Sequence, residues 1–254
     1  MSSSESLARI IPNGLKPPLR VALREYIYIR MYIRRKYRLW RCSKPVKKEI
    51  RFFVSHSREL EAQLGTAFVS YLLQAVVDTD HLEGDIIECG TYKGGSTILI
   101  AHVLAMVKSR KCIYACDTFE GHPYDDIDSA IDYHRAGRGS DTSVSYVQSK
   151  FQKFQVLDRI TFVKGKYEDT LLNKLGDKNF SLAFLDCDLY DSAKFCYSFI
   201  YPRMVHGGCI IVHDYIEPNK KRVFGISLAT DEFLREKGLA IERRGPFIHV
   251  IWVP

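Results

Sequence analysis

Short apolar runs alternate with longer amphipathic segments through most of this chain, and that alternation restricts the possible fold more than any other feature. The runs that resemble strands cover residues 84–90, 111–117, 159–165, 181–188 and 209–215. Strands that alternate with helices build βαβ units, and these units form a mainly parallel sheet with helices on both faces. The sequence therefore predicts an α/β chain of Rossmann-like architecture.

The segments between and beyond these runs supply the helices. Helical periodicity predicts helices over residues 57–77, 94–109, 143–157, 192–205 and 228–239. The sequence His-Gly-Gly at residues 206–208 predicts a turn before the strand at 209–215. Residues 240–254 have the pattern of two strands around Gly245 and Pro246, which predicts one antiparallel C-terminal strand in the sheet.

The positive charge of the chain lies at its N-terminal end. Residues 1–51 contain 14 Lys and Arg against 3 acidic residues, whereas the remaining 203 residues contain 23 against 27. We therefore expect a basic N-terminal extension, residues 1–51, followed by one globular domain, residues 52–254. The chain has seven scattered cysteines, and we expect these to be reduced core thiols rather than disulfides or a zinc site.

Residues 21–42 form a candidate amphipathic helix that is aromatic and strongly basic. Its aromatic and aliphatic side chains recur at helical spacing and most of its arginines lie elsewhere: Tyr26, Ile29, Ile33, Tyr37 and Trp40 against Arg24, Arg34, Arg35, Arg38 and Arg41. Two interpretations stay open, a peripheral contact with a membrane surface, or packing on its own domain or on a second copy in a homo-oligomer. Nucleic acid is a third option, but a charge cluster without a recognisable binding motif is weak evidence for it, so we do not expect a nucleic-acid partner.

The sequence shows no targeting or membrane-spanning segment. No window approaches the run of about 18 apolar residues that spans a bilayer, and the first residues lack the basic-then-apolar order of a secretory signal. We therefore expect a cytoplasmic protein, with a peripheral position at the inner membrane face as the alternative.

A glycine-rich turn, ECGTYKGGS, follows the first strand at residues 88–96. In open α/β sheets, ligands bind at the carboxyl ends of the strands, next to such a turn. Gly90 allows the backbone to bend, and Gly94 and Gly95 are expected to let a ligand approach the next helix closely. Ser96 is then expected to cap that helix.

The turn also bears on which nucleotide could bind. A dinucleotide site favours GxGxxG with the pyrophosphate at the helix N-terminus, whereas this turn has the pattern ExGxxxGGS. Glu88 is badly placed beside a pyrophosphate, but it suits the ammonium group of S-adenosylmethionine. Asp117, at the end of the second strand, suits the ribose hydroxyls of either nucleotide. A turn without any ligand is the remaining interpretation.

Five blocks of the sequence resemble the macrocin O-methyltransferase family, the sugar O-methyltransferases of macrolide and related antibiotic pathways. They occur in the family's order and spacing at residues 84–101, 116–123, 159–171, 185–192 with 201–208, and 210–215. The resemblance runs from about Gly84 to the C-terminus and leaves the N-terminal extension outside it. It implies a class I methyltransferase fold and an enzyme that uses S-adenosyl-L-methionine and a divalent metal to methylate a hydroxyl of a saccharide or other small-molecule acceptor.

The resemblance also implies a set of cofactor-binding residues when the blocks are matched position by position. Gly165, Tyr167 and Glu168 fall in the block that is expected beside the adenine. Together with the glycine-rich turn, the full set of candidates is Glu88, Gly90, Thr91, Tyr92, Gly95, Ser96, Asp117, Thr118, Gly165, Tyr167, Glu168 and Asp186.

The ends of two later strands carry the reactive groups that the resemblance implies. Asp186 matches the family's metal ligand, and Asp188 matches its proposed general base. The family's paired acids correspond here to His213 and Asp214, so the candidate metal ligands are Asp186, His213 and Asp214. Mg²⁺ prefers oxygen ligands, whereas imidazole suits Mn²⁺ better, and both ions stay candidates.

Strand geometry supports this chemistry independently. Asp186 and Asp188 point to the same side if the strand stays extended to residue 188. Three converging carboxylates would repel one another unless a cation lies among them. Asp188 would then take the acceptor proton, with His213 as a third metal ligand or an alternative base, while Asp191 is expected at the start of the next helix.

An irregular insertion at residues 124–143 predicts a substrate lid. His134 within it and His122 beside it are candidate contacts to acceptor hydroxyls. Two other functions stay open at this point: metal-independent methyl transfer to a phenol or carboxylate, and a cofactor-binding scaffold without catalysis.

Overall fold

The computed structural model describes residues 23, 40–123, 131–132, 136–216, 225–245 and 248–254. The chain divides into two compact units, residues 1–42 and residues 43–254, and almost all described residues belong to the second. Most of the candidate helix at residues 21–42 lies outside the described residues. The expected domain boundary at residue 51 falls inside helix α3 (Lys44–Ser55) of the second unit.

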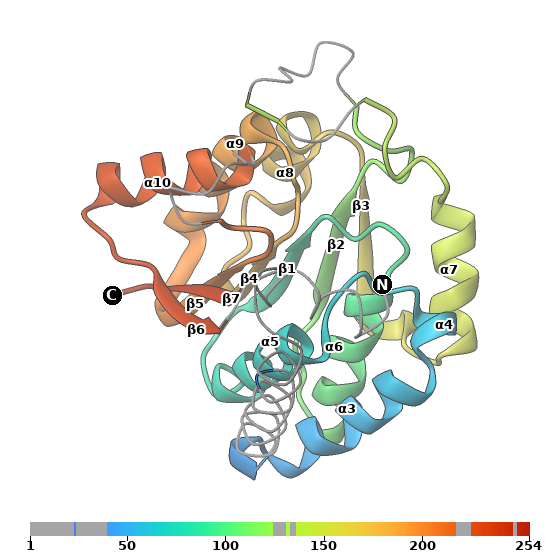
Figure 1. Ribbon diagram of the computed structural model, residues 1–254. Coiled ribbons are helices and arrows are strands. Elements are labelled where there is room, and N and C mark those ends of the chain that lie inside the picture. The colour runs from blue at the N-terminus through green and yellow to red at the C-terminus, as the bar shows by residue number, and fades with distance from the viewer. Residues whose placement is uncertain (1–22, 24–39, 124–130, 133–135, 217–224, 246–247) are drawn as a thin grey trace. The chain divides into compact units, whose positions relative to one another are not determined.

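Seven strands of the described residues form one sheet in the order β3-β2-β1-β4-β5-β7-β6 (Figure 1). They are β1 (Asp85–Cys89), β2 (Ile113–Asp117), β3 (Ile160–Lys164), β4 (Phe180–Leu185), β5 (Met204–Val212), β6 (Glu242–Gly245) and β7 (Ile248–Trp252). β7 runs antiparallel to both of its neighbours, and the other pairs are parallel. The predicted α/β sheet with one antiparallel C-terminal strand is therefore confirmed.

Helices cover both faces of this sheet (Figure 1). α3, α5 (Thr66–Asp78) and α6 (Gly95–Met106) pack together on one face, and α8 (Tyr167–Leu175), α9 (Tyr190–Ile200) and α10 (Gly225–Lys237) pack together on the other. The remaining elements are α4 (Ser57–Leu60), α7 (Val144–Lys153), η1 (Leu157–Arg159) and η2 (Tyr201–Arg203). Every residue of β4 is buried, as expected for a parallel strand that helices cover on both faces.

The predicted helix over residues 57–77 is wrong, because the structure divides it into α4 and α5. Glu61 follows α4 with a left-handed backbone (φ 49°), and α5 begins only after Gly65. A left-handed residue cannot continue a right-handed helix. Residues 61–65 therefore form a connection rather than a helical turn.

Helix α8 and the course of β5 also differ from the sequence prediction. α8 is a short helix that the helical periodicity of the sequence does not predict. Its first turn is acidic, which suits a helix N-terminus. The predicted turn at residues 206–208 is wrong, because these residues lie within β5. Gly207 has φ 78°, and the register between β4 and β5 shifts across this segment, as glycines in a strand allow.

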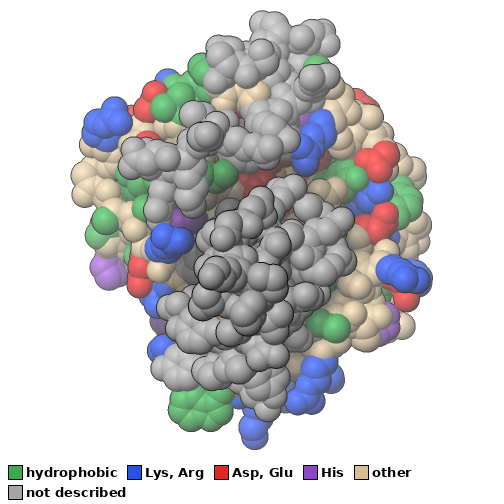
Figure 2. Space-filling view, in the orientation of Figure 1, with side chains coloured by type: hydrophobic (Ala, Val, Ile, Leu, Met, Phe, Trp, Pro, Cys, Tyr) green, Lys and Arg blue, Asp and Glu red, His purple; other side chains and the backbone are tan. Residues whose placement is uncertain are grey.

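The surface charges, the buried cysteines and the helices of the described residues can be compared with the sequence predictions. On the face shown in Figure 2, Lys and Arg side chains are scattered among Asp and Glu rather than gathered in one patch. Six of the seven cysteines are buried, as expected of core thiols. In the part of the chain that the structure describes, no helix combines the length and apolar character needed to cross a bilayer.

Candidate active site

A cavity of about 480 Å³ opens at the carboxyl edge of the parallel strands. Its wall includes residues from four neighbouring strand ends: Gly90 after β1, Asp117 at the end of β2, Asp186 after β4 and His213 after β5. The strand order reverses between β1 and β4, and open α/β sheets bind their ligands beside such a reversal. The volume is within the usual range for a small-molecule site.

Contacts within the protein shape the glycine-rich turn. A Cβ atom on Gly90, which has φ 100°, would lie 2.1 Å from the Asp186 carbonyl oxygen. A Cβ on Gly94 would lie 2.4 Å from an aromatic ring of α7, and one on Gly95 would lie 2.4 Å from the Leu60 carbonyl oxygen. Protein atoms thus fill the Cβ positions of both glycines, and of the two, Gly95 lines the cavity whereas Gly94 does not.

The expected capping role of Ser96 is wrong. Gly94 occupies the N-cap position of α6, and Ser96 lies inside the helix, where its hydroxyl donates to Glu88 at 2.5 Å. Thr97 donates to the other oxygen of the same carboxyl group. Glu88 is fully buried and lies behind the cavity wall, whereas Ser96 is part of that wall.

Burial also determines the charge of Glu88. Removal from water raises the pKa of its carboxyl group to about 8, although the two hydroxyl donors favour the ionised form. The neutral acid therefore predominates at neutral pH. A neutral carboxyl group behind the wall is a weaker partner for an ammonium ion than the sequence alone indicates.

Asp117 joins the turns that follow β1 and β2. Its carboxylate accepts hydrogen bonds from the backbone N–H groups of Tyr92 and Phe119, both at 2.7 Å. Burial raises the pKa of Asp117, and these two donors oppose that shift. Tyr92, Thr91 and Thr118 line the same cavity, so the candidate ribose partner and the glycine-rich turn lie together.

The segment after β3 reaches the cavity through only part of the expected adenine block. Tyr167 lines the cavity, whereas Gly165 and Glu168 do not. Gly165 has φ 133° and donates its N–H to the Asp117 carbonyl oxygen at 3.0 Å. Gly165 therefore turns the chain, and of these three candidates Tyr167 is the one that a ligand can contact.

Asp186, His213 and Asp214 converge at the ends of β4 and β5. One possible ligand atom from each lies within 4.8 Å of the others. Nδ1 of His213 lies 2.7 Å from a carboxylate oxygen of Asp186 and 3.5 Å from one of Asp214. Burial lowers the pKa of His213, but the surrounding carboxylates raise it to about 9. Two carboxylates and one imidazole in so small a volume fit a divalent cation.

Asp188 lies on the cavity wall, but the strand does not stay extended to this residue, so the condition for Asp186 and Asp188 to share a side through strand alternation is not met. β4 ends at Leu185, and Asp188 has a left-handed backbone (φ 62°). Its Oδ2 lies 3.4 Å from Nε2 of His122, which also lines the cavity. Asp191 lies in the first turn of α9, as expected for an acid near a helix N-terminus.

Several residues of the wall lie outside the set that the sequence predicts. Residues 61–64 belong to the connection that was expected to be helical, and Lys93 lies within the glycine-rich turn itself. Gly65 is the sequence signal for that connection, because glycine weakens a helix. The other wall residues outside the predicted set include Arg138, Asp141, Lys166 and Ser192. His134 and residues 124–130 of the expected lid lie outside the described residues.

Comparison with known proteins gives a consistent family match. A family model described as macrocin-O-methyltransferase (TylF) matches residues 64–243. The 8-demethyl-8-(2,3-dimethoxy-alpha-L-rhamnosyl)-tetracenomycin-C 4'-O-methyltransferase of Streptomyces olivaceus is 31% identical over 153 residues, which cover 56% of this chain and 58% of the relative. The mycinamicin III 3''-O-methyltransferase of Micromonospora griseorubida is 28% identical over 148 residues, which cover 55% and 58%. The chain thus spans less than two thirds of the length of these relatives.

Solved structures share the fold. The O-methyltransferase NovP has a TM-score of 0.66 and 23% sequence identity, and the match covers 74% of this chain and 80% of NovP. An O-methyltransferase from Bacillus cereus, solved in complex with SAH, has a TM-score of 0.52 and 14% identity over 84% of this chain and 91% of the other. At these identities the likeness concerns the fold alone.

Proposed function

The chain belongs to the macrocin O-methyltransferase family, and from this premise we propose that it transfers a methyl group from S-adenosylmethionine to a hydroxyl of a sugar or glycosylated small molecule. One curated relative is named for methylating a rhamnosyl-tetracenomycin. The observation that carries the proposal is that Asp117 shares one cavity with the cluster of Asp186, His213 and Asp214. Asp117 suits the ribose of a nucleoside, and the cluster suits methyl transfer to a hydroxyl group.

The proposed cofactor site uses the wall residues near the glycine-rich turn. Asp117, which two backbone N–H groups hold in place, is the proposed partner of the ribose, and Tyr167 is the proposed neighbour of the adenine. Glu88 and Gly165 do not line the cavity and would act through the wall residues that they contact, Ser96 and Asp117. Glu168 is exposed and does not line the cavity, so it receives no role in the proposed site. The wall residues retained in the proposed site are Gly90, Thr91, Tyr92, Gly95, Ser96, Asp117, Thr118, Tyr167 and Asp186.

Methyl transfer breaks the bond between the sulfonium sulfur and the methyl carbon, and it forms a bond from that carbon to the acceptor oxygen. The hydroxyl proton must leave as the new bond forms, so a base beside the acceptor assists the reaction. Asp188 is the proposed base, and His122, 3.4 Å from its carboxylate, would hold that carboxylate in place. His213 is the alternative base, a role that requires a neutral imidazole, whereas the neighbouring carboxylates favour its protonated form by raising its pKa.

Asp186, His213 and Asp214 are the proposed ligands of a divalent metal, Mn²⁺ or Mg²⁺. When bound, such an ion supplies electrostatic stabilisation of the negative charge that develops on the acceptor oxygen. These three residues also have effects that do not depend on a metal. Their carboxylates make this end of the cavity anionic, which suits a cationic sulfonium, and Asp186 orients the His213 imidazole at 2.7 Å.

Substitution of the two carboxylates tests this site. Asp186→Asn and Asp214→Asn are each expected to lower the rate of methyl transfer by about 10²-fold or more, because preorganised charge at the reacting centre is lost. Chelation of divalent ions should slow the unaltered protein similarly, and added Mn²⁺ or Mg²⁺ should restore the rate. Initial rates of S-adenosylhomocysteine formation measure both effects. Unchanged turnover of both variants under chelation would contradict the metal site and favour metal-independent transfer.

A further inference from the structure

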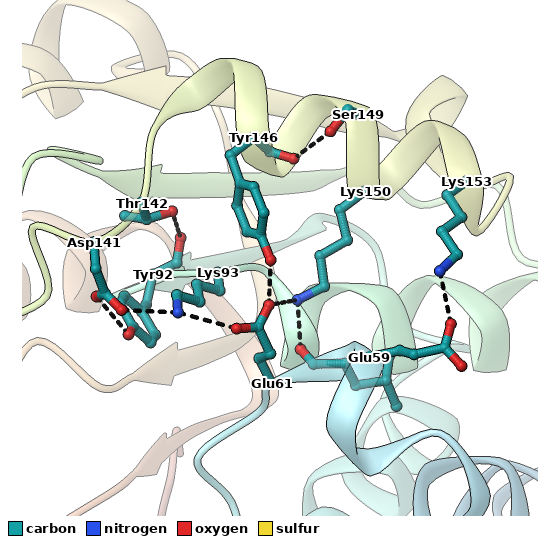
Figure 3. Close-up of polar contacts among 11 residues, drawn as sticks. Glu59, Glu61, Tyr92, Lys93, Asp141, Thr142, Tyr146, Ser149, Lys150 and Lys153 are labelled. Carbon is teal, nitrogen blue, oxygen red and sulfur yellow. Dashed lines mark hydrogen bonds and ion pairs between the residues drawn. The ribbon is translucent and has the colours of Figure 1, made fainter.

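Lys93 is a cation on the cavity wall with two carboxylate partners. Its Nζ lies 3.0 Å from Oε1 of Glu61 and 2.8 Å from Oδ2 of Asp141 (Figure 3). The Lys93 side chain is 15% exposed, that of Glu61 is 31% exposed and that of Asp141 is 65% exposed. Lys93 belongs to the glycine-rich turn, so this ammonium group lies at the end of the cavity proposed for the cofactor.

Donors from the glycine-rich turn and from α7 hold Glu61 in place (Figure 3). Besides Lys93, its carboxylate accepts hydrogen bonds from Nζ of Lys150 at 3.2 Å and from the hydroxyl of Tyr146, both on α7. Lys150, nearly buried, also donates to the Leu60 carbonyl oxygen at 2.7 Å. Partial burial raises the pKa of Glu61, but these donors lower it to about 2, so the group stays charged.

The contact between Lys93 and Asp141 is the exchangeable one. Asp141 lies mostly in solvent, where an ion pair contributes little. Its other carboxylate oxygen accepts a hydrogen bond from the Tyr92 hydroxyl at 2.7 Å, and because this contact is also exposed, water can replace both at small cost. Glu61 is less exposed, and α7 also holds it. Without Asp141, the group formed by Lys93, Glu61 and Lys150 has a net charge of about +1.

We propose that Lys93 binds the carboxylate of the cofactor's amino-acid end, that Glu61 positions Lys93, and that Asp141 occupies this place until the cofactor binds. The inference rests on the proposed function, because it takes S-adenosylmethionine as the ligand. A lysine that its neighbours already hold in place loses little freedom on binding, and it gives the carboxylate a charge-assisted hydrogen bond. Lys93 and Glu61 thus form a site for a carboxylate, and the Asp141 side chain occupies this site until the cofactor replaces it.

Two ligands that differ in the amino-acid end test this inference on the full chain. S-adenosylhomocysteine carries the carboxylate, whereas 5′-methylthioadenosine keeps the nucleoside and lacks the amino-acid end. Lys93→Met is expected to weaken binding of S-adenosylhomocysteine by about tenfold to a hundredfold, the range of a lost hydrogen bond to a charged group. The affinity for 5′-methylthioadenosine should change by less than about twofold. Titration calorimetry measures both affinities.

Three further variants separate a carboxylate contact from a structural role. Asp141→Asn removes the competing charge and should strengthen S-adenosylhomocysteine binding by about twofold to threefold, without an effect on 5′-methylthioadenosine. Glu61→Gln should weaken the first ligand selectively, and by less than Lys93→Met. Lys153→Met is the matched control, because Lys153 also lies on α7 and pairs with Glu59 at 2.7 Å in an exposed position away from the cavity wall. Neither affinity should change in this control.

The outcomes distinguish this inference from the proposed function. Equal weakening of both ligands by Lys93→Met would overturn the inference, because it would reveal a loss of structure. Weaker S-adenosylhomocysteine binding by Asp141→Asn would overturn it as well. If the unaltered chain binds both ligands and Lys93→Met binds S-adenosylhomocysteine normally, this inference alone fails. If the unaltered chain binds neither ligand, the proposed function fails together with it.

Discussion

Glu88 is a single carboxyl group whose burial couples its protonation to folding. Its pKa is about 8 in the folded protein, against an ordinary value of 4.5. The folded state therefore binds the proton more tightly, and the contribution of Glu88 to the free energy of unfolding falls as the pH rises between these two values. Below this range the group does not oppose folding.

Glu88→Gln tests that coupling, because glutamine has no proton to lose. Between about pH 5.5 and about pH 8.5, the free energy of unfolding of the variant should rise relative to that of the unaltered protein by on the order of 3 kcal/mol. Urea denaturation at the two pH values measures the difference. A difference that stays constant with pH would show that Glu88 is ionised in the folded state throughout.

His213 occupies the position of the first of two paired acids that the family resemblance implies, so this chain has an imidazole there in place of a carboxylate. His213→Asp would make the candidate metal site all-oxygen, and an all-oxygen site favours Mg²⁺ relative to Mn²⁺. The ratio of the Mg²⁺ to the Mn²⁺ dissociation constant should therefore decrease in the variant. Titration of the protein with each ion alone measures this ratio. An unchanged ratio would exclude His213 as a ligand.

At the residue scale, the sequence predicts the cluster of acids better than it predicts the cofactor turn. Asp186 and Asp214 follow neighbouring parallel strands, and such strand ends must meet at one edge of the sheet. Whether Glu88 reaches the cavity depends instead on how α6 packs, since Ser96 and Thr97 of that helix engage its carboxyl group. Sequence spacing does not contain that information.

At the scale of elements, the apolar strands were predictable because buried parallel strands give near-continuous apolar runs. The break between α4 and α5 was not, because it depends on the left-handed conformation of Glu61. Glu61 makes tertiary contacts to Lys93, Lys150 and Tyr146, and these lie far from it in sequence. Contacts of this kind override local helix propensity.

The packing of the connection against α6 predicts unequal effects of two glycine substitutions. Gly95→Ala would place a Cβ 2.4 Å from the Leu60 carbonyl oxygen, whereas a Cβ on Gly65 would meet nothing within 4 Å. Gly95→Ala should therefore lower the free energy of unfolding by about 1–3 kcal/mol, and Gly65→Ala, the matched control, should leave it nearly unchanged. Differential scanning calorimetry compares the two. Equal stability of both variants would contradict the close contact between the connection and α6.

At the scale of the whole molecule, the mainly parallel sheet followed from the alternation of strands and helices, and its antiparallel strand followed from the two C-terminal strands. The alternation alone does not give the order of the strands in the sheet. Most of the extension at residues 1–51 and half of the insertion at residues 124–143 lie outside the described residues. A membrane contact or an oligomer contact through residues 21–42 stays a prediction. The cavity proposed for the reaction lies at the carboxyl edge of the parallel strands.

Transfer of a labelled methyl group tests the central claim most directly. The full chain, with Mn²⁺ and S-adenosylmethionine labelled with ¹³C in its methyl group, is incubated with glycosylated small molecules and nucleotide-linked sugars, and NMR locates the label in the product. We expect the labelled methyl group on a sugar oxygen, and no such product from Asp186→Asn. Label on no sugar oxygen of any acceptor, although S-adenosylmethionine binds, would contradict the proposed function.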